Sequence, residues 1–148
     1  MAAGKIRAIA IAVIRRPKDG AILACYGDDT SDGRRFYRPL GGGIEFGETS
    51  ATAVVRELLE ETGAQVRPLR LLTVTENIFT HRGQRGHEVV FIWECQLLDE
   101  ALFALDEVVI NENGALAVAH WVHPDRLAAE GIHLYPDELP QLLRVMRK

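Results

Sequence analysis

Three glutamates, Glu57, Glu60 and Glu61, lie close together in the segment RELLEETGA, which runs from Arg56 to Ala64. Their spacing of i, i+3, i+4 places all three on one face of an α-helix. Like charges at this spacing cost about 0.2–0.5 kcal/mol per pair in an isolated helix. Glu60 and Glu61 would also lie in the last turn, where the helix dipole disfavours anions by about 0.3–1 kcal/mol each. A solvated acidic face is the simplest interpretation. However, these glutamates are unfavourable both as like-charged neighbours and as anions at a helix end, and residues that break two such rules are typical of a functional site.

A divalent cation would offset this repulsion. Carboxylate oxygens are hard ligands that suit Mg²⁺ or Mn²⁺, and these ions often bridge to the oxygens of a bound phosphate. The five histidines show no spacing typical of metal ligands, so we expect ordinary surface or core residues. Cys25 and Cys95 form no CxxC pair, which predicts reduced core thiols in a cytoplasmic chain.

A run of glycines, residues 41–43, precedes the acidic segment. Glycine lets the backbone approach a ligand closely, although a glycine run alone is a weak signal. Two further charged residues follow it in order, Glu48 and then Arg56. We expect Arg56 to pair with Glu48 or Glu57 and so to hold a carboxylate in a fixed orientation.

The helix that must carry these side chains is predicted over residues 50–62. Thr49 or Ser50 can cap its beginning, and Gly63 is a natural left-handed end. An apolar stripe at helical spacing should face a sheet; it consists of Ala51, Val54, Val55 and Leu58. The glutamates therefore project from a different face of the helix.

The remaining segments predict a mixed sheet covered by helices, an α/β or α+β fold. Apolar and β-branched runs predict strands at 6–15, 21–27, 65–80, 86–98 and 115–122. A polar loop is expected at 28–35, and a basic, glycine-containing turn at 81–86. Short helices are expected at 123–131 and 136–148, with Pro136 at a first helical position.

Length and charge exclude several classes of protein. The chain of 148 residues suits one domain, which we assign to 1–148. Its net charge of −4 lacks the electrostatic footprint of a binder of long nucleic acid. The N-terminal apolar run is about nine residues long, and a membrane helix needs about 20. We therefore expect no membrane association.

The fixed positions of the central segment resemble the Nudix box, G-x5-E-x7-R-E-U-x-E-E-x-G-U, where U is apolar. The matching residues are Gly42, Glu48, Arg56, Glu57, Leu58, Glu60, Glu61, Gly63 and Ala64. One departure lies next to it: Leu40 stands where many members have proline directly before the paired glycines, and Pro39 is one residue earlier. This difference affects the loop more than the chemistry.

The resemblance implies an α/β/α sandwich with a mixed sheet and a metal-dependent hydrolase that cleaves the pyrophosphate bond of a nucleoside diphosphate linked to another group. It implies Mg²⁺ or Mn²⁺ held by Glu57, Glu60, Glu61 and the Gly41 carbonyl, with Arg56 and Glu48 as the orienting pair. The base that activates water varies within the family. We favour Glu57 or Glu60; candidates outside the box are Glu88, Glu107 and Glu112. A homodimer is also plausible from the resemblance.

The substrate is less well defined by the sequence. Two basic segments could form a cationic rim for phosphates if they converge, and they contribute Arg34, Arg35, Arg38, Arg82 and Arg85. Base stacking is conceivable on Phe36, Tyr37, Phe79 or Trp93, although strand aromatics are more often core residues. Around the position of the subfamily markers, the sequence has neither the proline of ADP-ribose pyrophosphatases nor the tyrosine of diadenosine polyphosphate hydrolases. It has Phe79, Thr80, His81 and Arg82 there, and the nearby Pro68 is too early. A nucleoside triphosphate, ribo or deoxy, or a nucleotide-sugar-like diphosphate remains; the alternative is a binding module that retains the box without turnover.

Overall fold

The computed structural model describes residues 4–29 and 31–146. Its strands are β1 (Ile6–Val13), β2 (Ile22–Asp29), β3 (Arg34–Pro39), β4 (Gly41–Gly43), β5 (Val66–His81), β6 (Gln84–Leu97), β7 (Glu107–Glu112), β8 (Ala115–Val122) and β9 (His133–Leu134). The helices are α1 (Ser50–Thr62), α2 (Pro124–Ala129) and α3 (Leu139–Met146), with a 3₁₀ helix, η1 (Glu100–Ala104).

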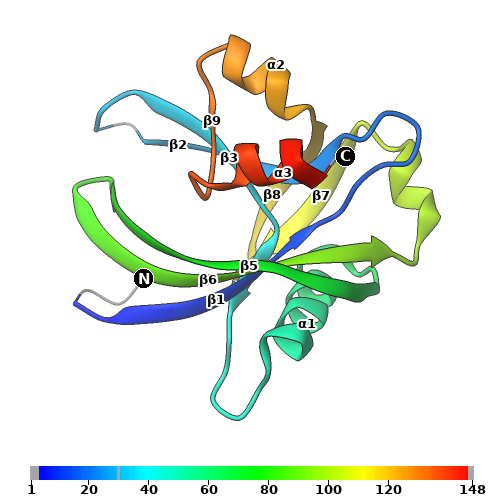
Figure 1. The fold of residues 1–148 in the computed structure, drawn as a ribbon, viewed down its shortest axis with the longest axis horizontal. Coiled ribbons are helices and arrows are strands. Elements are labelled where there is room, and N and C mark those ends of the chain that lie inside the picture. Colours follow the sequence, from blue (N-terminus) through cyan, green and yellow to red (C-terminus); the bar gives the residue numbers. More distant parts are fainter. Residues whose placement is uncertain (1–3, 30, 147–148) are drawn as a thin grey trace.

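The strands form two mixed sheets. The first sheet has the order β4-β1-β6-β5, in which only β1 and β6 run parallel. The second sheet has the order β7-β8-β2-β3-β9, in which β3 and β9 are the parallel pair. The expected mixed sheet is therefore divided into two, and the long β5–β6 hairpin of the first sheet is strongly curved (Figure 1).

Helices cover both sides of these sheets, with α1 on one side and α2 and α3 on the other (Figure 1). Strand β1 shows how the sequence builds the layers, because alternate side chains enter two different cores. Ala10, Ala12 and Ile14 pack in the core that contains the buried face of α1. Ile9, Ile11 and Val13 pack in the core beneath α2 and α3. The predicted α/β/α sandwich is confirmed.

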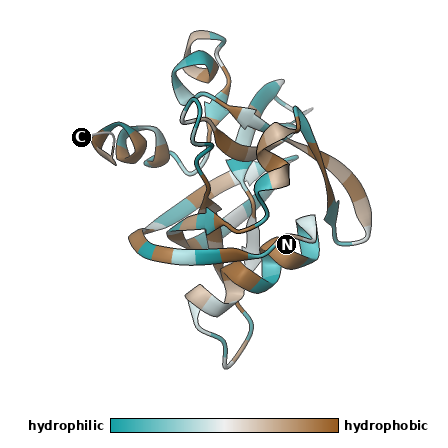
Figure 2. Cartoon of the chain, turned by 90° about the vertical axis from the view of Figure 1, so that its right-hand side faces the viewer, coloured by the Kyte–Doolittle hydropathy of each residue, from teal (hydrophilic) through white to brown (hydrophobic). Residues whose placement is uncertain are grey.

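Helix α1 begins and ends where the sequence predicts. The Thr49 hydroxyl accepts a hydrogen bond from the Thr52 amide at 3.2 Å, and Gly63 ends the helix with a φ of 75°. The buried face consists of Ala53, Val54, Leu58 and Glu61. Ala53 is thus buried where we expected Ala51 to be. Glu61, one of the three glutamates, also lies on the buried face, whereas we expected all three on a different face. Hydrophobic and hydrophilic residues alternate along the helices and strands (Figure 2).

The C-terminal helix differs from the prediction, which placed Pro136 at its first position. Helix α3 begins at Leu139 instead. The physical reason is Pro140: a helix that began at residue 136 would hold Pro140 in its interior, where the ring clashes with the carbonyl four residues earlier. Starting at Leu139 leaves Pro140 in the first turn, where its missing N–H costs nothing.

Strands also occupy segments where we expected loops. Strands β2 and β3 extend through Asp29 and from Arg34, so little of the expected polar loop remains. The glycine run is itself the short strand β4, and β7 had no counterpart in the prediction. Cys25 and Cys95 are free and buried, as expected. Within the described residues, no helix is long and apolar enough to cross a membrane.

Candidate active site

The glycine strand β4 brings the backbone against the acidic face of α1. It pairs with β1, placing Gly41 opposite Ile11 and Gly42 opposite Ala10. The Gly41 amide donates a hydrogen bond to the Glu61 carboxylate at 3.1 Å. A Cβ atom on Gly42 would lie only 2.5 Å from the carboxyl carbon of Glu57. Glycine at position 42 therefore creates the space in which this carboxylate lies.

Arg56 is the centre of a network of charged hydrogen bonds. Its guanidinium donates to both oxygens of Glu48, at 2.8 and 2.9 Å, and to the Gly43 carbonyl at 2.9 Å. Another nitrogen of the same group lies 3.2 Å from Glu57 and 3.3 Å from Glu60. The hydrogen bonds from Arg56 lower the pKa of Glu48 to about 2. This geometry ties the glycine strand to the helix and fixes the directions of several carboxylates.

The three glutamates experience different environments. Glu60 is 58% exposed, whereas Glu61 is only 8% exposed. Burial, followed by the charge of Glu57, raises the pKa of Glu61 to about 8. Burial also raises the pKa of Glu57. A carboxyl group held in this way favours either a proton or a cation beside it.

All three glutamates line one pocket, which they share with the glycine strand; we name it the acidic pocket. Their side chains do not yet converge on a point. Among the residues that the structure describes, no three His, Cys, Asp or Glu side chains are already arranged around a single metal position. Arg56 lies between Glu57 and Glu60 and pairs with both.

A second pocket adjoins the acidic pocket. Its aromatic lining residues are Tyr26, Phe36, Phe79 and Tyr135, and we name it the aromatic pocket. Its volume is about 400 Å³, within the range of about 300–1,000 Å³ that is usual for small-molecule sites. Four charged residues line both pockets and form the junction between them: Arg7, Arg38, Glu88 and Glu112. The cleft is therefore continuous from the acidic side chains to the aromatic ones.

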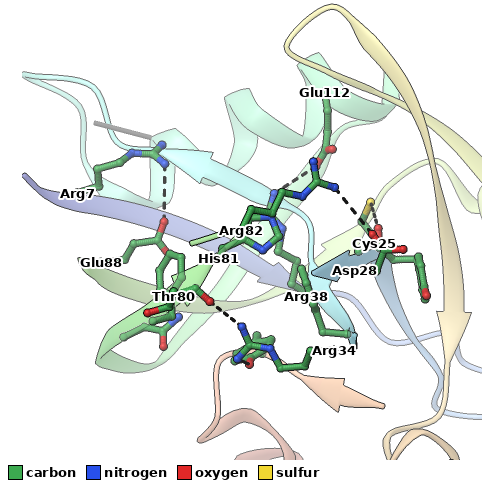
Figure 3. A pocket seen from close by; sticks show the side chains of 16 residues that line it. Arg7, Cys25, Asp28, Arg34, Arg38, Thr80, His81, Arg82, Glu88 and Glu112 are labelled. Carbon is green, nitrogen blue, oxygen red and sulfur yellow. Dashed lines mark hydrogen bonds and ion pairs between the residues drawn. The ribbon is translucent and has the colours of Figure 1, made fainter. Parts of the chain in front are cut away.

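Several charged pairs line this cleft (Figure 3). Arg38 lies 3.2 Å from Glu112 at the junction, and Arg7 lies 3.7 Å from Glu88. In the aromatic pocket, the exposed pair Arg82 and Asp28 lies at a separation of 3.8 Å. Each arginine is thus held by a carboxylate while it remains accessible to an anionic ligand.

The two basic segments partly converge, as the sequence suggested. Arg34, Arg38 and Arg82 line the aromatic pocket together with Phe79, whereas Arg85 lines an adjoining hollow. Arg35 points away and donates to the Glu130 carbonyl at 3.2 Å. Three of the five arginines therefore line the aromatic pocket, and a phosphate-binding role for them stays a prediction.

The candidate stacking residues also divide into two groups. Phe36 and Phe79 line the aromatic pocket. Tyr37 and Trp93 pack against the two cores, and the Trp93 indole donates to the Ser50 hydroxyl at 3.0 Å. Among the outlying glutamates, Glu107 lines neither pocket and lies 3.4 Å from His120.

The tip of the β5–β6 hairpin is fastened to the second sheet by Asp29, which is only 1% exposed. Its carboxylate accepts hydrogen bonds from the Arg82 amide at 2.8 Å and the Ser31 amide at 2.9 Å. The pKa of Asp29 is lowered chiefly by a further hydrogen bond from the Ser31 hydroxyl and then by that from the Arg82 amide, because both stabilise its charged form. Nearby, Arg34 donates to the Thr80 carbonyl at 2.6 Å and to the Tyr135 hydroxyl at 2.9 Å. This set of contacts closes the far end of the aromatic pocket.

Sequence reasoning missed several residues that line the cleft: Arg7, Tyr26, Asp28, Asn77 and Tyr135. Arg7 had a usable signal, because it is a charged residue inside an otherwise apolar strand. Gly27 offered another, because a glycine inside a strand often marks a place where another group approaches closely. In the structure, the Phe36 ring covers it, and a Cβ atom there would lie 2.6 Å from that ring. The others carry no local pattern that distinguishes them from surface residues.

Comparison with known proteins agrees with this geometry. The model of the NUDIX domain matches residues 5–143. This chain belongs to the Nudix family. A relative described as a mutator protein, MutT4 of Mycobacterium tuberculosis (strain CDC 1551 / Oshkosh), is 33% identical over 116 residues. That match covers 76% of this chain but only 44% of the relative.

Solved structures share the Nudix fold at lower identity. A UDP-X diphosphatase superimposes with a TM-score of 0.64 at 22% identity, over 97% of this chain and 63% of that protein. An ADP-ribose pyrophosphatase from Streptococcus suis 89-1591 gives a TM-score of 0.61 at 19% identity, over 96% and 92% of the two chains. The resemblance of the box to the Nudix family is thus confirmed.

Proposed function

We propose that this Nudix protein is a metal-dependent pyrophosphohydrolase, which cleaves the phosphoanhydride of a nucleoside diphosphate linked to another group. The observation that carries this proposal is the continuous cleft, in which Glu57, Glu60 and Glu61 line one end and aromatic and arginine side chains line the other. Such a cleft matches the two ends of a nucleotide, an anionic diphosphate and a flat base. The pyrophosphatases among the solved structures support the same reaction class.

The residues of the acidic pocket fit Mg²⁺ or Mn²⁺. All candidate ligands are oxygens, and Glu61 is a buried carboxylate whose pKa of about 8 marks a place for a positive charge. We propose Glu57, Glu60, Glu61 and the Gly41 carbonyl as the ligands. Mg²⁺ usually keeps several waters and binds substrate phosphates, so a few protein ligands suffice. Once bound, the ion would neutralise phosphate charge and lower the pKa of a bound water.

The protein groups supply the remaining chemistry. Hydrolysis adds water across one P–O–P linkage, so the attacking water must lose a proton to a base as the new P–O bond forms. We keep Glu57 and Glu60 as the candidates for this base, since both face the acidic pocket. Glu48 and Arg56 would hold Glu57 in place. Arg38 would bind phosphate oxygens, as would Arg82 further along the cleft.

A turnover assay tests the proposal. Nucleoside triphosphates and nucleoside diphosphate sugars are incubated with Mg²⁺, and release of phosphate, pyrophosphate or nucleoside monophosphate is measured. We expect turnover of at least one compound and its loss by about 100-fold or more in the variants Glu60→Gln and Glu61→Gln, because a bound metal contributes several kcal/mol to such reactions.

The matched control is Glu76→Gln, the same substitution at an exposed position on β5 that lines neither pocket. It should retain full activity. Thermal unfolding of every variant separates loss of chemistry from loss of structure. Undiminished turnover in both site variants would contradict the proposed ligand set, and no turnover of any compound by the wild type would leave a nucleotide-binding module as the better description.

A further inference from the structure

The cleft has an order that matches the order of parts in a nucleotide. Glu57, Glu60 and Glu61 line only the acidic pocket, while Phe36 and Phe79 line only the aromatic pocket of the two. A nucleotide with its diphosphate at the glutamates and its base among the aromatic rings must place its sugar at the junction between them. The residues of that junction therefore face the ribose or deoxyribose.

Glu88 is the junction residue with unused hydrogen-bonding capacity. The residue is only 9% exposed, and its ion-pair partner among the described residues, Arg7, lies 3.7 Å away, beyond hydrogen-bonding distance. Throughout residues 4–29 and 31–146, no side chain or amide donates a hydrogen bond to its carboxylate. A carboxylate offers about four acceptor positions. Among the described residues, Glu88 is not one of those with a side-chain oxygen or nitrogen both fully buried and unpaired, so its oxygens open into the pocket and can accept hydrogen bonds there. A ligand that brings donors would fill those positions.

The neighbouring strand adds a second polar group beside Glu88. Asn77 on β5 pairs directly with Glu88 on β6, and Arg7 on β1 pairs with it from the other side. Directly paired residues point to the same face of a sheet. Asn77, Glu88 and Arg7 therefore form a polar row across the first sheet, and all three line the aromatic pocket.

Glu112 is the other carboxylate of the junction, and it is less suited to the same role. It accepts a hydrogen bond from Arg38 at 3.2 Å, and its side chain is 34% exposed. Its acceptor capacity is partly used and partly hydrated. The two junction arginines, in turn, are donors that suit phosphate oxygens rather than hydroxyl groups.

We propose that Glu88, supported by Asn77, accepts hydrogen bonds from the ribose 2′- and 3′-hydroxyl groups, so that the substrate is a ribonucleoside diphosphate derivative and not its 2′-deoxy counterpart. This inference rests on the proposed function for the location of the diphosphate. A ribose presents two adjacent hydroxyl donors, and a deoxyribose presents one. With the nucleotide covering the junction, a missing 2′-hydroxyl would leave the Glu88 carboxylate short of one donor, and such a loss discriminates more strongly than a missing apolar contact.

The test compares matched sugar pairs. kcat/KM is measured with Mg²⁺ for the four ribonucleoside triphosphates and their 2′-deoxy counterparts, and for nucleoside diphosphate sugars with each sugar. For the best base, we expect a preference of about 10- to 100-fold for ribose, the value of a hydrogen bond to a charged group. The variant Glu88→Ala should bring this ratio close to one. Glu88→Gln keeps one acceptor oxygen and should retain part of the preference.

Three controls make the result specific. Glu76→Gln on the same hairpin should leave the ratio unchanged, and thermal unfolding confirms that each variant folds. Binding of ribonucleoside diphosphates and their 2′-deoxy forms, measured by calorimetry, gives the same ratio without turnover. If no compound is hydrolysed, the proposed function fails, and the binding ratio still decides this inference.

Two outcomes overturn the assignment. Equal kcat/KM and equal affinity for ribose and deoxyribose in the wild type would show that the junction does not read the 2′-hydroxyl. A ribose preference that survives in Glu88→Ala, with both sugars slowed equally, would show that Glu88 supports the chemistry and another group reads the sugar.

Discussion

Replacing Gly42 by alanine should remove activity while the protein stays folded. The new Cβ would lie 2.5 Å from the Glu57 carboxyl carbon, whereas ordinary contacts begin at 3.4 Å, so the carboxylate must retreat by about 0.9 Å. A misplacement of about 1 Å at a reacting centre can cost about 100-fold in rate. We therefore expect kcat/KM to fall about 100-fold, which corresponds to about 2.7 kcal/mol of transition-state stabilisation.

Stability should respond differently from activity. Gly42 is not among the glycines with a positive φ, so alanine fits its backbone conformation. A compatible Gly→Ala change stabilises a protein by about 0.4–1 kcal/mol through its unfolded state, which offsets the displacement of one side chain. Thermal unfolding should consequently show a midpoint close to that of the wild type.

The matched control is Gly43→Ala. Its Cβ would meet only the end of the Arg7 side chain, at 3.2 Å, and that flexible group can move by a few tenths of an ångström. We expect a much smaller loss of activity than for Gly42→Ala. Steady-state kinetics and calorimetric titration with Mg²⁺ are the two assays. If Gly42→Ala keeps wild-type kcat/KM and wild-type affinity for Mg²⁺, Glu57 does not need its present position and the reasoning is refuted.

Further predictions concern charge and pH. The raised pKa of Glu61 means that its carboxyl group stabilises the metal-free fold fully below its ordinary pKa of 4.5, and this contribution is lost as the pH rises through about 8. In EDTA, the midpoint temperature of thermal unfolding should therefore fall as the pH is raised through this window, and it should fall less in Glu61→Gln. The affinity for Mg²⁺ should rise with pH. Arg56→Lys cannot reproduce the two-pronged contact with Glu48 and should cost about 10–100-fold in kcat/KM; equal kinetics would exclude a positioning role. Asp29→Asn should lower the urea midpoint and raise KM, because the hairpin tip loses its charged anchor; an unchanged midpoint would contradict this.

The sequence predicted the box helix and its charges well because the relevant signals are local. The cap at Thr49, the left-handed end at Gly63 and the apolar positions each act within a turn or two of the chain. The pairing of Arg56 with Glu48 is nearly as local, since the two residues are eight positions apart. Patterns of this range are readable without knowledge of the rest of the fold.

The aromatic pocket could not be predicted in the same way. Tyr26, Asn77 and Tyr135 lie on three separate segments and meet only when the two sheets assemble. No spacing rule links them, and each has the composition of an ordinary strand or loop residue. The beginning of α3 depends on two prolines, Pro136 and Pro140. Pro136 suits the first position of a helix, so the sequence favoured a start there, but such a helix would hold Pro140 in its interior.

The second sheet contributes to one end of the cleft and not to the three glutamates, although the first sheet also lines the aromatic pocket through Asn77 and Phe79. The glutamates stand on α1 beside the first sheet, whereas Phe36 and Asp28 stand on β3 and β2 of the second sheet. Substitutions in the second sheet can thus change the lining of the aromatic pocket while Glu57, Glu60 and Glu61 keep their positions. Duplicated copies of such a gene can diverge in this pocket through few substitutions, each copy retaining the acidic side chains of its ancestor.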